Sequence, residues 1–102
     1  MATDPNDTGQ LRMDVGRRLL QSRIAIGLNQ TDFANGAGLS QPQYSPFETG
    51  ARLLSVQAAI KISRTYNLSL DWLYEGDPSS LAVKIFQAIR ENDISFKGSS
   101  DL

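Results

Sequence analysis

The side chains that could contact another molecule lie in one short segment, where Gln41, Gln43 and Ser45 offer two amides and a hydroxyl. Such groups recognise a partner through hydrogen bonds. The chain has no cysteine and no histidine, which excludes disulfides, thiolate or imidazole metal sites and imidazole acid–base catalysis. Its carboxylates are scattered, and no nucleophile, glycine-rich phosphate loop or metal-ligand cluster appears. We therefore expect no enzyme, metal, cofactor or small-molecule substrate.

The elements that must position these side chains lie within residues 28–50, LNQTDFANGAGLSQPQYSPFETG, which predict two short helices joined by a glycine-containing turn. Asn29 is a good N-cap for the first helix. Gly38 stands where the chain must turn sharply and predicts a positive φ. Ser40 caps the second helix, and Gln43 holds the reciprocal position of a capping box. Two short helices around a glycine turn are the outline of a DNA-reading unit.

The rest of the chain is predicted to form one all-helical domain, because 102 residues with 40% apolar composition support a single modest core. Helical spacing predicts a first helix over about residues 11–26, and Ser55 and Ser69 are N-caps of two later helices. Val56, Ala59, Ile60 and Ile62 are predicted to line the buried side of the helix after Ser55, which Asn67 ends in a left-handed conformation. The predicted parts are a disordered leader at 1–9, a helix-turn-helix domain at 10–76 with its motif at 30–48, a linker and C-terminal helix at 77–92, and a frayed tail at 93–102.

The C-terminal helix, expected from about Ser80 to Asn92, is unusually apolar, because seven of the nine residues from 81 to 89 are apolar. One interpretation is a helix buried across its own domain. The other is a twofold dimer contact. Periodicity does not say what covers an apolar face, so both interpretations stay open. The dimer interpretation places the contact on Leu81, Ile85, Phe86 and Ile89.

Charge and hydropathy give weaker constraints. The net charge is −1, but residues 15–76 hold six basic and four acidic side chains and are mildly basic, at +2. That excess is small for a protein that grips phosphates. The N-terminus lacks an apolar stretch behind basic residues, and no run approaches membrane-spanning length. We expect a cytoplasmic protein with no membrane contact.

Residues 15–76 resemble the lambda-repressor-like family, the Cro and Xre type of helix-turn-helix regulator. The matching segments are VGRRLLQSRIAIGLNQ, QTDFA, AGLS, SQPQYSPFETG and LSLDWLYEG, in the family's order. Their joint spacing carries the resemblance through Gln30, Ala34, Gly38, Ser40, Glu48, Gly50 and the end Asp71-Trp72-Leu73. The resemblance implies a five-helix DNA-binding domain with an additional C-terminal helix. It also implies a transcriptional regulator, most simply a repressor that binds double-stranded DNA as a homodimer at a near-palindromic operator.

The resemblance further implies that residues 41–48 are a recognition helix in the major groove, while residues 30–37 cross the DNA backbone. Glutamine can bridge N6 and N7 of adenine. The implied base contacts are Gln41, Gln43 and Ser45, and the implied phosphate contacts are Asn29, Gln30, Thr49, Arg52 and Arg17. This hypothesis requires residues 41–45 to stand outward, free of neighbouring side chains.

Two buried features are also expected. The family pairs an arginine near the end of the first helix with a glutamate near the end of the third, so the resemblance implies a partly buried structural ion pair of Arg23 and Glu48. Tyr44, Phe47 and Trp72 fall on the apolar sides of their helices and are expected in the core.

Pro46 departs from the family pattern. Inside a regular helix a proline lacks the N–H for the carbonyl four residues earlier and costs about 3 kcal/mol. Ser45 would also be pushed away from helical geometry. The sequence predicts that the helix is either kinked or ends near Tyr44 and resumes as a turn through Phe47. A second departure is GARLLS, where Arg52 is the sole basic residue, so weak, salt-sensitive binding is expected.

These departures keep a second hypothesis open. The same scaffold could serve as a protein-interaction module, such as an antitoxin-like adaptor, with Pro46 compromising the recognition helix and the apolar last helix binding a partner. A regulator should shift DNA fragments and lose binding when Gln41 and Gln43 become alanine. An adaptor should co-purify with another protein. The sequence does not give the operator, the inducing signal, the sign of regulation or the oligomeric state.

Overall fold

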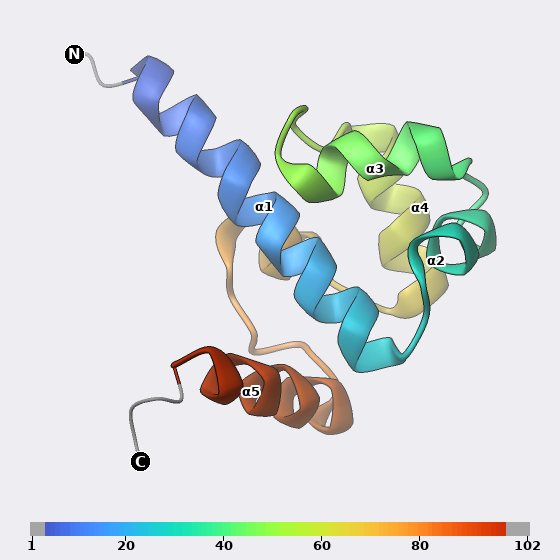
Figure 1. Ribbon diagram of the computed structural model, residues 1–102, viewed down its shortest axis with the longest axis vertical. Helices are drawn as coiled ribbons and strands as arrows, with labels where there is room; N and C mark the ends of the chain where they lie inside the picture. The colour runs from blue at the N-terminus through green and yellow to red at the C-terminus, as the bar shows by residue number, and fades with distance from the viewer. Residues whose placement is uncertain (1–3, 98–102) are drawn as a thin grey trace.

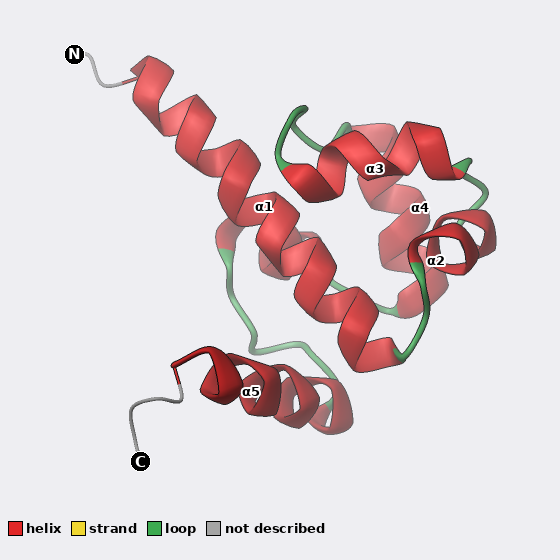
Figure 2. Cartoon of the chain, in the orientation of Figure 1, coloured by secondary structure: helices red, strands yellow, loops and turns green. Residues whose placement is uncertain are grey.

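The computed structural model describes residues 4–97, and the side chains of residues 9–91. Over that range the chain is all-helical without a strand, which confirms the predicted fold class (Figures 1 and 2). The elements are α1 (Asp4–Ile26), α2 (Gln30–Gly36), α3 (Gln41–Thr49), α4 (Val56–Tyr66), the π-helical segment η1 (Asp71–Glu75) and α5 (Val83–Lys97). None of the described helices has both the length and the apolar character needed to cross a membrane.

The first helix is longer than predicted. It begins at Asp4 and not near residue 11, so residues 4–9, which were expected in a disordered leader, are helical here. Residues 1–3 lie outside the described part. Two local features favour this early start. An acidic side chain at a helix N-terminus complements the helix dipole, and Pro5 in the first turn has no N–H that needs a partner. Gly27, with φ of 93°, closes the helix.

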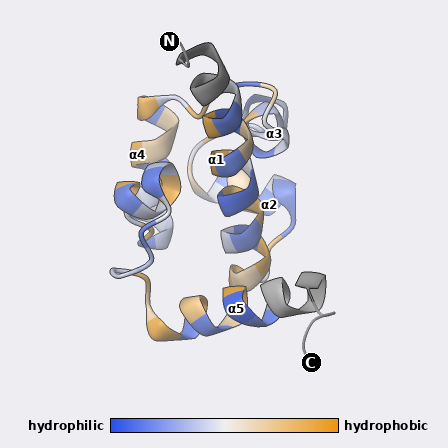
Figure 3. Ribbon diagram, turned by 90° about the vertical axis from the view of Figure 1, so that its left-hand side faces the viewer, coloured by the Kyte–Doolittle hydropathy of each residue, from blue (hydrophilic) through white to orange (hydrophobic). Residues whose placement is uncertain are grey.

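The core lies between α1 and the helices α2 to η1, with α1 running past all of them (Figure 1). Phe33 of α2 is fully buried, stacks on Tyr66 with ring centroids 4.3 Å apart and also contacts Tyr44. The aromatic residues predicted for the core, Tyr44, Phe47 and Trp72, are all buried. Hydrophobic and hydrophilic residues are mixed along each helix, as surface helices require (Figure 3).

Two buried features of α1 were not predicted. Gly16 lies against the end of α3, where an added Cβ would stand 2.5 Å from the Glu48 carbonyl oxygen, so glycine allows the two backbones to approach. Ser22 is fully buried: it donates to the carbonyl of Arg18 at 2.7 Å and accepts from the indole N–H of Trp72 at 2.9 Å. The Ser22 hydroxyl thus satisfies the one polar atom of the Trp72 side chain.

The turns agree with their sequence signals. Gly38 has φ of 80°, and Asn67 ends α4 in the left-handed region with φ of 58°. Ser40 and Gln43 form the predicted capping box at α3, and the hydroxyl of Ser55 accepts from the N–H of Ala58. One assignment on α4 is wrong: Val56 is 64% exposed. It stands in the first turn of α4, next to the exposed residues Ser55 and Gln57.

The third helix continues through Pro46 from Gln41 to Thr49, so the prediction that it ends near Tyr44 is wrong, and Ser45 is helical. Tertiary contacts on both sides of the proline outweigh its local cost. Tyr44 and Phe47 are buried in the core, and the carbonyl of Pro46 accepts a hydrogen bond from the N–H of Arg52 at 3.1 Å. Propensity is a weak term beside such burial.

The last helix lies at the other end of the molecule from α3 (Figures 1 and 3). It begins at Val83 and not at Ser80, because the N–H of Leu81 closes a turn on the carbonyl of Pro78 before the helix starts. It continues to Lys97, past the predicted end at Asn92, so residues 93–97 of the expected frayed tail are helical here. Residues 98–102 lie outside the described part.

Candidate nucleic-acid interface

The carboxylate of Glu48 is the centre of the candidate interface, because four donors converge on its two oxygens. Arg23 donates from Nε to Oε2 at 2.7 Å and from Nη2 to Oε1 at 2.9 Å. The hydroxyl of Tyr44 donates to Oε2 at 2.7 Å, and the amide of Gln30 donates to Oε1 at 2.9 Å. The structure therefore brings Arg23 and Glu48 together and ties α1, α2 and α3 to one charged group.

The environment keeps this carboxylate ionised. Burial alone would raise the pKa of Glu48, but the hydrogen bonds from Arg23, Gln30 and Tyr44 outweigh it and hold the pKa below its ordinary value. The hydrogen bond to Glu48 raises the pKa of Arg23. Burial, followed by the hydrogen bond to Glu48, raises the pKa of the Tyr44 phenol. All three groups keep their ordinary charge at neutral pH.

The network reaches the first residue of α3 through a chain of two amides. A carboxylate only accepts hydrogen bonds, so it draws the N–H of Gln30 inward and turns the Gln30 carbonyl toward α3. That carbonyl accepts from Nε2 of Gln41 at 2.6 Å. Gln41 is therefore not free of neighbouring side chains, and the sequence prediction is wrong on this point. Its carbonyl oxygen and its second N–H are the groups left to face outward.

The other predicted base-contact residues lie along the same helix. Gln43 is exposed, and its side-chain carbonyl accepts from the backbone N–H of Ser40 at 3.2 Å. This contact leaves the Gln43 amide N–H groups as its outward donors. Ser45 is half-buried on the side of the helix away from Phe47.

The predicted phosphate-contact residues differ in whether their side chains already form hydrogen bonds or ion pairs within the protein. The side chain of Asn29 caps α2 by accepting from the N–H of Asp32 at 2.7 Å. The exposed hydroxyl of Thr49 donates to the carbonyl of Pro46 at 3.3 Å. Arg17 pairs with Asp14 at 3.2 Å and is half-exposed. Arg52 is exposed next to the end of α3, and within the described range no side-chain contact holds it.

Two further arginines donate hydrogen bonds to backbone carbonyls within the fold. Arg12 donates from Nε to the carbonyl of Gly50 at 3.1 Å and so holds the end of α3. Arg18 donates to the carbonyl of Leu73 at 3.3 Å beside Gly76, and burial lowers its pKa. No short-range sequence signal marks these contacts, because each joins residues 38 or more positions apart.

Comparison with known proteins decides the family. A helix-turn-helix family model matches residues 19–73, which is more than half of the chain. The chain belongs to the Cro/Xre-type helix-turn-helix family. The match includes α2, the turn at Gly38 and α3, the elements that carry the predicted contacts.

A bacterial relative also matches the chain. The chain is 33% identical over 60 residues to the uncharacterized HTH-type transcriptional regulator YqaE of Bacillus subtilis (strain 168). The match covers 59% of this chain and 49% of that protein, so the chain spans about half the length of the relative. No solved structure matches the chain.

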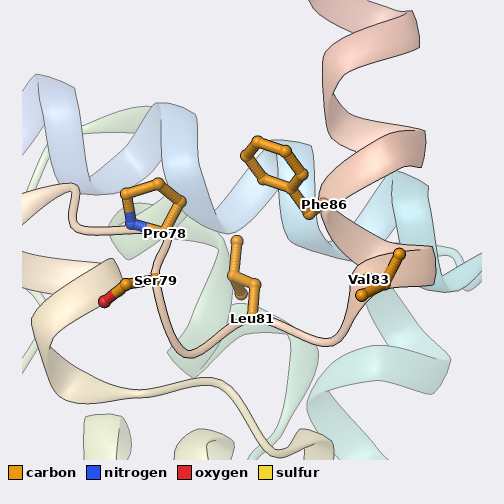
Figure 4. Close-up of a pocket in the computed structure, with 5 residues that line it drawn as sticks. All are labelled: Pro78, Ser79, Leu81, Val83 and Phe86. Carbon is orange, nitrogen blue, oxygen red and sulfur yellow. The ribbon is translucent and has the colours of Figure 1, made fainter.

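The last helix lies outside the segment that matches the helix-turn-helix family. Of its four predicted dimer-contact residues, Leu81 and Ile89 are 8% and 4% exposed and pack into the core of their own chain. Ile85 and Phe86 are half-buried against that core. Phe86 and Leu81 line a groove of about 290 Å³ together with Pro78, Ser79 and Val83 (Figure 4). Burial of α5 on its own domain therefore accounts for much of its apolar pattern.

Proposed function

We propose that this protein is a sequence-specific DNA-binding transcriptional regulator that inserts α3 into the major groove of double-stranded DNA. We further propose that it is a cytoplasmic repressor that occupies a near-palindromic operator as a homodimer. The observation that carries the proposal is how α3 is attached to the domain. Buried Tyr44 and Phe47 and the hydrogen bonds from Arg23 and Gln30 to Glu48 hold its inner side, while its outer side is free to enter a groove.

The N-terminal residues of α3 supply groups that suit base edges. Gln41 presents a carbonyl oxygen and one N–H, the pair that accepts from N6 and donates to N7 of adenine. The exposed Gln43 presents N–H donors, which suit the acceptors N7 and O6 of guanine or N7 of adenine. Ser45 stays a proposed contact through its hydroxyl.

Few cations are available to neutralise phosphates. Arg52 follows α3, and Asn29 and Gln30 stand at the N-terminus of α2, where the helix dipole favours an anion. Arg17 would have to leave Asp14 to contact a phosphate. Because affinity for DNA rises with the number of neutralised phosphates, one copy of the chain should bind weakly. Two linked copies on one duplex gain affinity from their effective concentration, which favours the homodimer.

The direct test is selection of bound duplexes from a random pool by the full chain, followed by affinity measurements on the enriched duplex. We expect an enriched inverted repeat. Replacing Gln41 and Gln43 together by alanine should reduce affinity for that duplex at least tenfold, since each good bidentate pair gives about 1–3 kcal/mol of discrimination. Gln57→Ala, an exposed glutamine on α4, is the matched control and should change nothing. No enrichment, together with co-purification of another protein, would favour an adaptor.

Arg52 gives a second, independent test through salt dependence. Arg52→Ala should weaken binding to the same extent on all sequences and should reduce the slope of log affinity against log salt by about 1. Lys84→Ala removes an exposed cation from α5, at the far end from α3, and should leave the slope unchanged. Equal effects of the two variants would contradict the assignment of Arg52.

A further inference from the structure

The outermost part of α3 is apolar. Tyr44 and Phe47 point into the core, so residues on the opposite side of the helix face solvent. Pro42 is exposed there, and Pro46 lies one turn further along, half-buried. Thr49 follows on the same side and is exposed. The centre of the outer face is therefore formed by Pro42 and Thr49. Pro46 flanks it on one side and the half-buried Ser45 on the other, with Gln41 and Gln43 at its margins.

This face has little capacity for hydrogen bonding. Proline has no N–H and its ring offers only methylene groups. The Thr49 hydroxyl donates to the carbonyl of Pro46 at 3.3 Å and accepts from the N–H of Ala51 at 3.4 Å, which leaves its methyl group outward. The two rings and the methyl group cannot read a pattern of donors and acceptors. They can select only an apolar group, while the Ser45 hydroxyl beside them is the polar group of this face.

The position of Pro46 is also locally unfavourable. A proline inside a helix costs about 3 kcal/mol, and the core contacts of Tyr44 and Phe47 do not require a proline between them. The burial of its neighbours outweighs this cost but does not call for a proline, and a residue that breaks a local rule is typical of a functional site.

We propose that Pro42 and Pro46 are specificity-determining residues that select thymine through its C5 methyl group. The methyl of thymine is the apolar feature that the major groove of DNA presents, and small apolar side chains contact it. Residues one helical turn apart are about 5–6 Å from one another. This spacing is under two base steps of about 3.4 Å, so both rings can reach methyl groups within one short stretch. The inference rests on the proposed function and specifies the bases that α3 reads.

The test replaces thymine by deoxyuridine, one position at a time, in the duplex enriched by the full chain. This substitution removes the methyl group and keeps the base pairing. Burying one methyl-sized group is worth about 0.8 kcal/mol, so affinity should fall about fourfold at one or two positions in each half-site. Thymines elsewhere in the duplex should give no change.

Variants of the prolines identify the residues responsible. Pro46→Ala restores a helical N–H and should raise the melting temperature, so a changed base preference cannot be attributed to unfolding. Alanine keeps one methyl in place of the ring, so in this variant the deoxyuridine penalty should shrink at one of the sensitive positions. Pro42→Ala should shrink the penalty at the other. Pro78→Ala, an exposed proline in the linker before α5, is the matched control and should keep both penalties.

The outcomes separate this inference from the proposed function. An enriched duplex that binds equally well with deoxyuridine at every position would overturn the inference alone. So would half-sites without thymine, or penalties that persist undiminished when both Pro42 and Pro46 are alanine. Failure to enrich any duplex would overturn the proposed function and this inference with it.

Discussion

The two ends of the molecule, α3 and α5, are attached to the domain in different ways. Glu48 ties α3 to α1 and α2 through three directional hydrogen bonds, two from Arg23 and one from Gln30, which set the rotation of the helix about its axis. At the other end, Leu81 just before α5 and Ile89 within α5 attach by apolar burial, which has no direction. A surface that reads bases needs fixed side-chain orientations, and polar contacts provide them. The difference favours α3 as the recognition element and leaves α5 with a mainly structural role.

The largest effect is expected from removing the charge at the centre of the α3 attachment. The side chains of Glu48 and Arg23 are 7% and 16% exposed, so Glu48→Ala leaves a nearly buried arginine without its partner. The free energy of unfolding should fall by about 3–5 kcal/mol, measured by urea denaturation. Glu91→Ala on α5 removes an exposed carboxylate and is the control. Arg23→Ala combined with Glu48→Ala should cost less than the sum of the two, and additive losses would refute the pair.

The next largest effect is expected from shortening a buried apolar side chain of α5. This change tests whether the apolar residues of α5 pack within the monomer. Ile89→Ala should lower the free energy of unfolding by about 2–5 kcal/mol at every protein concentration, because Ile89 is buried in its own chain. Val83→Ala, at a position that is 70% exposed, should change stability by no more than about 0.5 kcal/mol. The dimer interpretation would gain instead if Ile89→Ala left the monomer stable and weakened self-association.

Gly16 gives a smaller effect and tests how closely α1 must approach α3. Gly16→Ala places a Cβ 2.5 Å from a backbone oxygen, which cannot move aside as the end of a flexible side chain could. The free energy of unfolding should therefore fall by about 1–3 kcal/mol. Gly9→Ala in the same helix is the control, because its Cβ meets nothing nearer than 4.0 Å and alanine is the better helix former. Equal stabilisation by both variants would contradict the close approach.

The smallest expected effect is on the pH dependence of stability, which should differ between the attachments of α3 and α5. The folded pKa of Glu48 lies below its unfolded value of about 4.3, so its contribution is complete above that pH and is lost as pH falls toward the folded pKa. Glu48→Gln should therefore flatten the fall in stability as the pH drops below about 4.3. Ile89→Ala should reproduce the acid profile of the wild type. A Glu48→Gln profile parallel to the wild type would show that the network does not stabilise the carboxylate.

The sequence predicted what is determined locally. Caps and turns such as Ser40, Ser55, Gly38 and Asn67 depend on neighbours within a few residues, and these predictions are confirmed. Contacts between distant residues were missed unless the family resemblance supplied them. The hydrogen bond from Trp72 to Ser22 joins residues 50 positions apart and has no local pattern.

The candidate site shows the same limit. The resemblance implied the pairing of Arg23 with Glu48, but the donor from Gln30 depends on how α2 and α3 meet. The donor from Tyr44, four residues before Glu48 in α3, was not predicted either. Pro46 was judged by its local cost, which the burial of its neighbours outweighs. The apolar pattern of the last helix could not say which surface covers it.

The central claim is that α3, and not α5, is the surface that meets DNA. It is tested most directly by amide chemical shifts of the full chain as the enriched duplex is added. The account predicts shifts concentrated on Asn29, Gln30 and residues 41–52, with α5 unchanged. Shifts concentrated on α5, with α3 unaffected, would contradict it.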